Sequence, residues 1–384
     1  MNIIVGQVAS KNDFWGRENE IANIWDALMS GSSVLLAAPR RVGKTSIMYK
    51  LRDEPQGNFI VLYSIVSSAH STNAFWERLF RDISSTDFAD TFGNKARHFF
   101  GLAKTIKIDS VSANGVKFGD SKEMSYLEAF KELILKMDES IKLIIMVDEF
   151  AQAIDNMVNK GDKGEAQLLL QDVRLLRQDD RFSSKVQFVF AGSIGLESVV
   201  IKADSSTKEI NDLNSIPINP FNLQDAKKFA LKLASDNAIA VADEQIDYTL
   251  AKLEWLIPFH IQIMMQELKR LRKIELSNDD VDEAFRQALK QRNHFEHWKK
   301  RLNSLDASEY KFAKEMLNKI SEDSMMASSE IMNLATKHEL EEDEAKNIIR
   351  SLIYDGYINN DENPKIYRFN SAMLKMWWFQ NVAN

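Results

Sequence analysis

Residues 33–46 join a short apolar run to a glycine-containing turn, and this junction constrains the fold more than any other part of the chain. The run Ser33–Ala37 has the length and composition of a buried β-strand. It passes through Ala-Pro-Arg-Arg-Val into Gly43–Thr45, where a helical pattern begins. A strand that leads through such a turn into a helix is the pattern of a phosphate-binding loop. Ala38 replaces the first glycine that is usual in this loop and keeps that position small.

The chemistry expected of this loop follows from its geometry. Backbone N–H groups surround a polyphosphate, the Lys44 ammonium reaches the outer phosphates, and the Thr45 hydroxyl ligates Mg²⁺. The helix from Thr45 to Leu51 directs the positive end of its dipole at the same anion, and Gly43 leaves room for close approach. The alternative is a chance Gly-Lys-Thr at the start of a helix. The residues predicted to bind the nucleotide here are Ala38, Pro39, Arg40, Arg41, Val42, Gly43, Lys44, Thr45 and Ser46.

A second motif downstream supplies the acidic residues that such a loop requires. Residues 143–150 read Leu-Ile-Ile-Met-Val-Asp-Glu-Phe, an apolar strand that ends in Asp148 and Glu149. A buried parallel strand presents polar residues at its carboxyl end, where open α/β sheets bind ligands. Asp148 is therefore predicted to hold Mg²⁺ opposite Thr45, and Glu149 to orient or deprotonate the attacking water of ATP hydrolysis. The alternative is a strand that merely ends in a solvated Asp-Glu turn.

Two further features have both a catalytic and a structural interpretation. The apolar strand Val186–Ala191 leads to Ser193, whose hydroxyl is predicted to hydrogen-bond the γ-phosphate or the lytic water. An ordinary strand-to-turn exit is the alternative. Arg177 lies near the end of a helix with Arg174 and Arg181. In the catalytic interpretation one of these arginines inserts into the site of a neighbouring subunit, whereas in the structural one they form a solvated basic face.

Composition excludes several classes of protein. The chain has 384 residues, a net charge of −7 and no cysteine, so it has neither a disulfide framework nor a cysteine-based metal site. This length allows two or three domains. No signal segment and no apolar run long enough to span a membrane is visible, so we expect a cytoplasmic protein without membrane contact. The negative charge argues against a general electrostatic affinity for nucleic acid.

Short apolar runs alternate with amphipathic segments over the first two-thirds of the chain, which predicts an α/β fold with a parallel sheet covered by helices on both faces. The five expected strands are Ser33–Ala37, Phe59–Ser64, Leu143–Val147, Val186–Ala191 and Ser215–Ile218. The helices expected between them include Asn19–Ser30, Ala74–Ile83, Tyr126–Asp138 and Ala166–Gln178. Residues 86–123 break this alternation, because four glycines stand among alternating Ile, Val and Phe residues. This segment predicts an inserted hairpin.

The strands stop near residue 222, and the remaining chain divides into two helical blocks. The first block is expected to contain helices at Leu223–Asn237, Asp243–Glu254, Ile261–Leu271 and Ser277–Gln291. The second is expected to contain helices at Ser308–Ile320, Ser328–His338 and Glu341–Asp355, two short strands around 359–364 and a last helix with Trp377 and Trp378. Three helices followed by a hairpin form a winged-helix arrangement. The predicted domains are therefore a core over 1–221 that contains the 86–123 insertion, a helical region over 222–300 and a winged helix over 301–384.

Several segments together point to one family. They are Phe14–Glu20 with the sequence Phe-Trp-Gly-Arg-Glu-Asn-Glu, the loop Ala38–Ser46, the acidic motif Val147–Phe150, Ala191–Ser193, and the tail Tyr367–Ser371 with Leu374, Trp377 and Trp378. They resemble the archaeal-type ATPases of the STAND group of signal-transduction P-loop NTPases, which are related to AAA+ and origin-recognition ATPases. The resemblance covers nearly the whole chain.

This resemblance implies an AAA+-like five-stranded core, a helical lid over 222–300 and a C-terminal winged helix. The implied cofactors are ATP or ADP with Mg²⁺. The residues implied for the adenine pocket are Phe14, Trp15, Gly16 and Arg17. Lids of this family carry a Gly-x-Pro element near the nucleotide. The segment Leu256–Phe259 keeps Pro258 but lacks the glycine, so Pro258 is the candidate lid contact to ADP.

The resemblance also implies a nucleotide switch, in which ADP holds the lid and winged helix against the core and ATP with a trigger releases them. We therefore expect a Mg²⁺-dependent ATPase that couples nucleotide state to self-assembly or to activation of a separate effector protein. The implied context is stress response or defence against mobile elements. A scaffold that binds nucleotide without hydrolysing it is a further alternative.

A rival interpretation is an ATPase of the origin-recognition or transposition-accessory kind that acts on DNA through the winged helix. Charge argues against it, because residues 300–384 hold 11 Lys and Arg against 14 Asp and Glu. The third helix of this block opens with four carboxylates at Glu341–Glu344. In a helix-turn-helix the first residues of that helix enter the major groove, where phosphates repel carboxylates. We therefore expect protein contact in preference to DNA contact.

Overall fold

The computed structural model describes residues 1–84, 108–111, 115–118 and 124–383, which form two compact units. The first, called the sheet unit below, comprises residues 17–38 and 44–218. The second, called the helical unit, comprises residues 1–16, 39–43 and 219–384. The tip of the predicted phosphate-binding loop, residues 39–43, therefore belongs to the helical unit, although the strand before it and the helix after it belong to the sheet unit.

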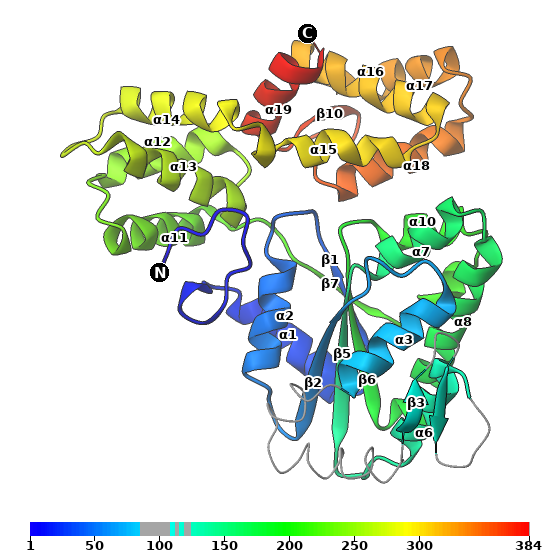
Figure 1. The fold of residues 1–384 in the computed structure, drawn as a ribbon. Coiled ribbons are helices and arrows are strands. Elements are labelled where there is room, and N and C mark those ends of the chain that lie inside the picture. The colour runs from blue at the N-terminus through cyan, green and yellow to red at the C-terminus, as the bar shows by residue number, and fades with distance from the viewer. Residues whose placement is uncertain (85–107, 112–114, 119–123, 384) are drawn as a thin grey trace. The chain divides into compact units, whose positions relative to one another are not determined.

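The sheet unit is built on five parallel strands in the order β2-β5-β6-β1-β7 (Figure 1). The strands are β1 Val34–Ala37, β2 Phe59–Ile65, β5 Lys142–Asp148, β6 Val186–Ala191 and β7 Asn214–Pro217. Each predicted strand is confirmed, with its ends shifted by no more than one residue. Since all five strands run the same way, the carboxyl ends of β1, β5 and β6 meet at one edge of the sheet.

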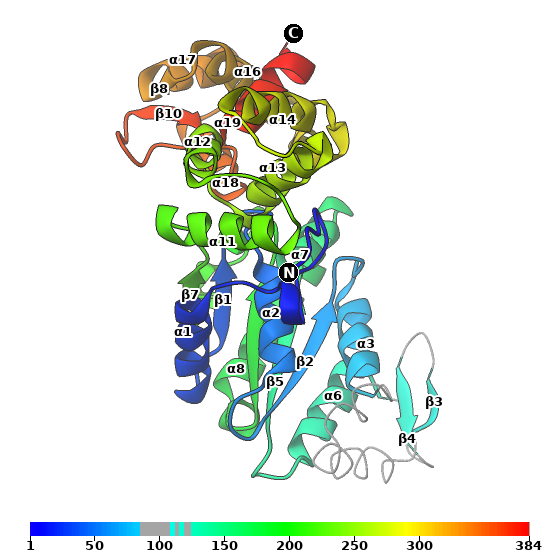
Figure 2. The same ribbon diagram turned by 90° about the vertical axis from the view of Figure 1, so that its left-hand side faces the viewer.

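Burial explains why the central strands are apolar along their whole length. Every residue of β6 is buried, and in β5 only Lys142 at its start is exposed. A strand covered on both sides has no solvent face, so its sequence does not alternate. Helices lie on both faces of this sheet (Figures 1 and 2). They are α1 Glu18–Met29, α2 Lys44–Asp53, α3 Thr72–Ile83, α6 Tyr126–Leu135, α7 Phe150–Asn159, α8 Lys163–Gln178, α9 Asp180–Ser183 and α10 Leu196–Lys202.

Two parts of the sheet unit bear on the sequence predictions. Helices α7 and α10 are the next helices after the strands β5 and β6, and the sequence analysis did not predict them. Helix α7 begins at Phe150, the last residue of the predicted acidic strand motif. Within the predicted insertion, β3 Ile108–Val111 pairs antiparallel with β4 Val116–Phe118. The rest of residues 86–123 lies outside the described residues apart from Gly115.

The helical unit consists of a four-helix group followed by a mixed block. The helices of the first group are α11 Leu223–Asp236, α12 Asp243–Leu253, α13 Pro258–Leu271 and α14 Asn278–Lys290. The elements that follow are α15 Glu296–Arg301, α16 Ala307–Asp323, β8 Met326–Ala327, α17 Ser328–Lys337, α18 Glu342–Tyr354, β9 Ile358–Asn359, β10 Ile366–Phe369 and α19 Ala372–Trp378. The last strands form a small antiparallel sheet in the order β8-β10-β9. Strand β8 escaped prediction because two residues carry no alternation.

No helix of the described residues combines the length and the apolar composition needed to cross a bilayer.

Gly356 lies in a closely packed part of the helical unit, where a side chain would meet its neighbours. It has a φ of +82°, and a Cβ placed on it would lie 2.6 Å from the Trp255 ring and 3.0 Å from the Cβ of Pro39. The two neighbours come from the four-helix group and from the loop tip. Glycine at this position therefore lets three separate segments of the helical unit meet.

We predict that Gly356→Ala lowers the free energy of unfolding by about 2–4 kcal/mol, because it adds a steric clash to an unfavourable φ. Gly161→Ala is the matched control, since Gly161 has a φ of +83° and no heavy atom near the added Cβ. The control should lose only about 1 kcal/mol. Urea unfolding measures both, and equal losses would contradict the packing argument.

Candidate functional site

The loop between β1 and α2 encloses the ammonium group of Lys44. The side chain is buried, and its Nζ donates a hydrogen bond of 2.6 Å to the carbonyl oxygen of Ala38. Ala38 is itself buried. An ammonium group at the start of a helix is placed where a phosphate group can bind.

The backbone conformation of Gly43 gives a reason for glycine beyond the room for a phosphate that the sequence predicts. It has a φ of +104°, a conformation that residues with a side chain rarely adopt, and no heavy atom lies within 4 Å of an added Cβ. The need for glycine therefore comes from the backbone conformation of the loop and does not depend on space within the chain. Arg41, two residues earlier, has a φ of +68°. A non-glycine residue in this region costs about 1–3 kcal/mol, and such strain concentrates at functional sites.

The two predicted metal ligands lie in contact. Thr45 Oγ1 donates to Asp148 Oδ2 over 2.9 Å, which joins the first turn of α2 to the end of β5. Asp148 is buried, and its other oxygen accepts a hydrogen bond of 3.0 Å from the backbone N–H of Glu149. Hydroxyl and carboxylate oxygens are the donor set that Mg²⁺ prefers.

Glu149 and Ser193 are also brought together. The Ser193 hydroxyl donates to Glu149 Oε2 over 2.9 Å, and the Ser193 backbone N–H donates to the same oxygen over 3.1 Å. Glu149 has a φ of +59° and is the N-cap of α7. This turn aims the carboxylate of Glu149 toward the end of β6, where Ser193 lies.

Tyr63 is a member of this site that the sequence analysis missed. Its hydroxyl donates to Asp148 Oδ2 over 2.8 Å. Burial, with a further contribution from the Asp148 carboxylate, raises the pKa of Tyr63 far above its usual range, so the hydroxyl remains a donor at neutral pH. A tyrosine within an apolar strand looks like an ordinary core aromatic. Only the pairing of β2 with β5 identifies it as a neighbour of Asp148.

The loop tip is surrounded by aromatic residues and histidines of the helical unit. The Arg41 guanidinium lies 4.5 Å from the ring centroid of Phe259, which follows Pro258 at the start of α13. Burial, with a smaller contribution from the charge of Arg41, lowers the pKa of His260 and of His297 to about 3. These rings are therefore neutral at physiological pH. The described residues contain no group of three or more acidic or histidine side chains placed to hold a metal ion.

The remaining predicted residues have these environments. In the helical unit, the Trp15 ring lies 6.3 Å from that of Phe229 on α11. In the sheet unit, Arg17 is buried and pairs with Glu20 over 2.7 Å. Of the other members of the predicted set, Phe14, Gly16, Pro39, Arg40 and Val42 belong to the segments that lead into α1 and α2, and Ser46 lies in the first turn of α2.

Arg177 is held within its own chain. It donates to both carboxylate oxygens of Asp212, over 2.8 and 2.9 Å, and its side chain is 3% exposed. Insertion into another subunit would require breaking this bidentate pair and exposing both charges. Arg177 is therefore not part of a solvated basic face, and its buried pair with Asp212 also argues against the catalytic interpretation.

Comparison with known proteins supports the fold and no closer relationship. No protein-family model and no curated protein matches the sequence. Among solved structures, the chain is similar to a Walker-type ATPase of Pyrococcus abyssi, with 17% identity, a TM-score of 0.68, and coverage of 98% of this chain and 99% of that one. It is also similar to the ORC2 protein of Aeropyrum pernix, solved as ADPNP–ADP complexes, with 11% identity, a TM-score of 0.56, and coverage of 99% and 96%. The chain has the fold of AAA+-like P-loop ATPases.

We predict that Tyr63→Phe raises the Mg²⁺ concentration needed for half-maximal nucleotide binding about tenfold, because partners that orient a ligating carboxylate contribute to metal affinity on this scale. Tyr49→Phe is the matched control, since the Tyr49 ring packs edge-on against Tyr63 at 4.9 Å without contacting Asp148. Titration with Mg²⁺ at fixed nucleotide measures the effect. An unchanged Mg²⁺ requirement in Tyr63→Phe would exclude an orienting role.

A second prediction concerns pH. Since unfolded histidine titrates near 6.5 and folded His297 near 3, the unfolded state takes up the proton first, and stability is lost as the pH falls from about 6.5 toward 3. Each such histidine contributes a slope of about 1.4 kcal/mol per pH unit in this window. Urea unfolding between pH 7 and 5 should show a shallower slope for His297→Gln, and the wild-type slope for His70→Gln at an exposed site. Identical slopes would contradict the account.

Proposed function

We propose that this chain binds ATP and ADP together with Mg²⁺, hydrolyses ATP, and uses the nucleotide as a switch. The observation that carries the proposal is the 2.9 Å contact between the Thr45 hydroxyl and the Asp148 carboxylate. Lys44 directly precedes Thr45 in the sequence, and Glu149 directly follows Asp148. Chemically this is a cation, a metal-ligating pair and a general base at the carboxyl edge of a parallel sheet. Such a combination suits transfer of a phosphoryl group to water.

Each side chain has a distinct part in this proposal. Thr45 and Asp148 would hold Mg²⁺, which offsets charge on the phosphate oxygens when bound. Lys44 binds the outer phosphates, and Glu149 positions and deprotonates the attacking water. Ser193 fixes the carboxylate of Glu149 through its two hydrogen bonds. Phe14–Arg17 and Pro258 complete the proposed nucleotide contacts at the adenine pocket and lid.

The switch is supported by the segments that make up the helical unit, because the loop tip is one of them. The loop tip, residues 39–43, groups with the helical unit, where Pro39 lies close to Gly356 and Arg41 lies over Phe259. A nucleotide that reorders this tip must alter its packing against the four-helix group and the C-terminal block. It shifts the equilibrium only to the extent that it binds one arrangement more tightly than the other.

We assign residues 222–300 to a lid and 301–384 to a winged helix within this proposal. The elements of the second block, three helices with a small antiparallel sheet, support that assignment. The proposed output is self-assembly in the ATP state or activation of a separate cytoplasmic effector protein, in stress response or defence against mobile elements.

A DNA-handling ATPase is the second candidate, and it is favoured by the three helices with a small antiparallel sheet that we assign to a winged helix. The first turn of α18 holds Glu342, Asp343 and Glu344, with Glu341 as its N-cap. Carboxylates at the end of a recognition helix oppose contact with phosphate. Binding of duplex DNA by the full chain at 150 mM salt, lost on charge reversal of Lys365 and Arg368 in the β9–β10 region, would favour this candidate over the protein switch.

We predict that Lys44→Ala weakens ATP and ADP binding roughly 10- to 100-fold, since one charge-assisted contact to phosphate is removed. Glu149→Gln should retain ATP but lose turnover by about 100-fold or more. Lys50→Ala is the control, because Lys50 lies on the same helix and pairs with Glu54 on the surface. Calorimetry and phosphate release measure the two effects. Unchanged turnover in Glu149→Gln would indicate a scaffold without hydrolysis.

A further inference from the structure

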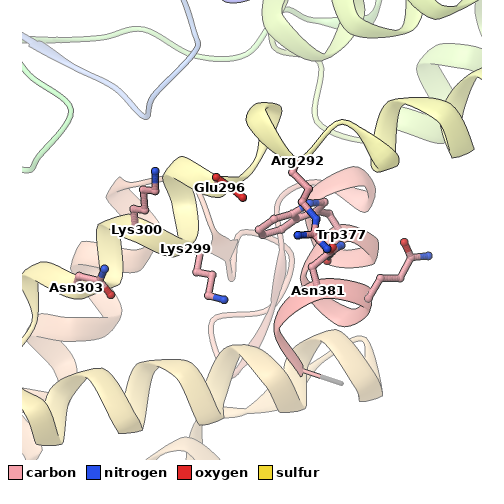
Figure 3. A pocket seen from close by; sticks show the side chains of 8 residues that line it. Arg292, Glu296, Lys299, Lys300, Asn303, Trp377 and Asn381 are labelled. Carbon is pink, nitrogen blue, oxygen red and sulfur yellow. Dashed lines mark hydrogen bonds between the residues drawn. The ribbon is translucent and has the colours of Figure 1, made fainter.

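A hollow lined mostly by polar side chains lies within the helical unit, and its residues are distant in sequence from the loop tip. Its volume is about 400 Å³, which is within the size range of small-molecule sites. It is bounded by the segment from Arg292 to Asn303 and by the last turns after α19 (Figure 3). The polar side chains that line it include Arg292, Glu296, Lys299, Lys300, Asn303 and Asn381.

The charges in this hollow are unpaired. Among the described residues, no carboxylate forms an ion pair with Arg292, Lys299 or Lys300, and Glu296 has no cationic partner. Their sequence neighbours Arg286 and Arg301 are paired, with Glu283 and Asp355 respectively. The hollow thus concentrates a net charge of +2 in a chain whose net charge is −7. The side chains of Arg292, Lys299 and Lys300 are exposed, and cations without partners favour an anionic ligand.

The wall behind these charges is rigid. Trp377 is 1% exposed, and its ring stacks on Phe295 with centroids 5.7 Å apart, while Phe295 stacks on Trp298 at 6.1 Å. The Asn381 amide donates to the Trp377 carbonyl oxygen over 2.9 Å, which fixes this side chain at the rim. Figure 3 shows Arg292 and Asn381 beside the Trp377 ring, with Lys299 directed toward the C-terminal turns. A preformed wall reduces the entropy cost of binding.

We propose that this hollow binds a phosphate ester that carries hydroxyl groups, such as a sugar phosphate. A phosphate dianion matches the net charge of +2, whereas a carboxylate would leave one cation unpaired. Arg292 and Lys299 bind the phosphate oxygens through charge-assisted hydrogen bonds. Glu296 is an acceptor and therefore binds a hydroxyl group of the same ligand. The volume accommodates one small molecule, and the buried Trp377 offers no exposed ring face on which the bases of a nucleic acid could stack.

The test uses the full chain with Lys44→Ala, which weakens the proposed ATP site and so reduces its contribution to the signal. The probes are ribose 5-phosphate, inorganic phosphate and a single-stranded oligonucleotide. The readout is the ¹⁵N-labelled indole resonance of Trp377, assigned by its loss in Trp377→Phe, together with calorimetry. We expect ribose 5-phosphate to shift this resonance saturably and to bind more tightly than inorganic phosphate.

The charge dependence is tested by the double substitution Arg292→Glu with Lys299→Glu, which should weaken ribose 5-phosphate at least tenfold. The matched control is Lys208→Glu with Lys228→Glu, two exposed lysines outside the hollow, and it should change affinity little. The proposal would be overturned if both double substitutions weakened ribose 5-phosphate binding equally, or if ribose 5-phosphate did not shift the Trp377 indole resonance. Binding of the oligonucleotide alone would also overturn it. Failure here is distinguishable from failure of the proposed function, because the hollow is read through the Trp377 resonance and ATP binding is measured separately on the unsubstituted chain.

Discussion

The hydrogen bond between Thr45 and Asp148 is the contact on which the rest of the site depends. It joins the first turn of α2, the helix that follows β1, to the end of β5, although β6 lies between β1 and β5 in the sheet. The same order explains the position of Ser193, which follows the intervening strand and bonds to Glu149. One strand order therefore brings the lysine-threonine turn, the acidic pair and the serine to a single edge. A different order would leave the same motifs without chemistry.

The loop tip connects this edge to the helical unit through the chain itself. Lys44 and Thr45 belong to the sheet unit, whereas residues 39–43 group with the helices that hold Phe259 and Gly356. Arg41 and Glu149 both have positive φ, and each costs free energy that the surrounding packing must offset. Strain at these two positions is consistent with a site whose local conformation has been selected for function rather than for stability.

Much of this arrangement is predictable from sequence, and the features that the sequence analysis missed have physical explanations. The strands were predicted because full burial forces a continuous apolar run, and their polar ends located Asp148, Glu149 and Ser193. Tyr63 was missed because its role depends on the neighbouring strand and not on any local pattern. The positive φ of Gly43 was not predicted, because a backbone conformation is not visible in the sequence. The bidentate pair of Arg177 with Asp212 joins residues distant in sequence, which no local motif records.

The most direct test of the central claim is the position of a metal ion. Crystals of the full chain grown with Mn²⁺ and a non-hydrolysable ATP analogue give an anomalous signal from the metal alone. The account predicts one peak within coordination distance of the Thr45 hydroxyl and no farther than one bridging water from the Asp148 carboxylate. A metal–nucleotide complex bound elsewhere, or no bound nucleotide at saturating concentration, would contradict it.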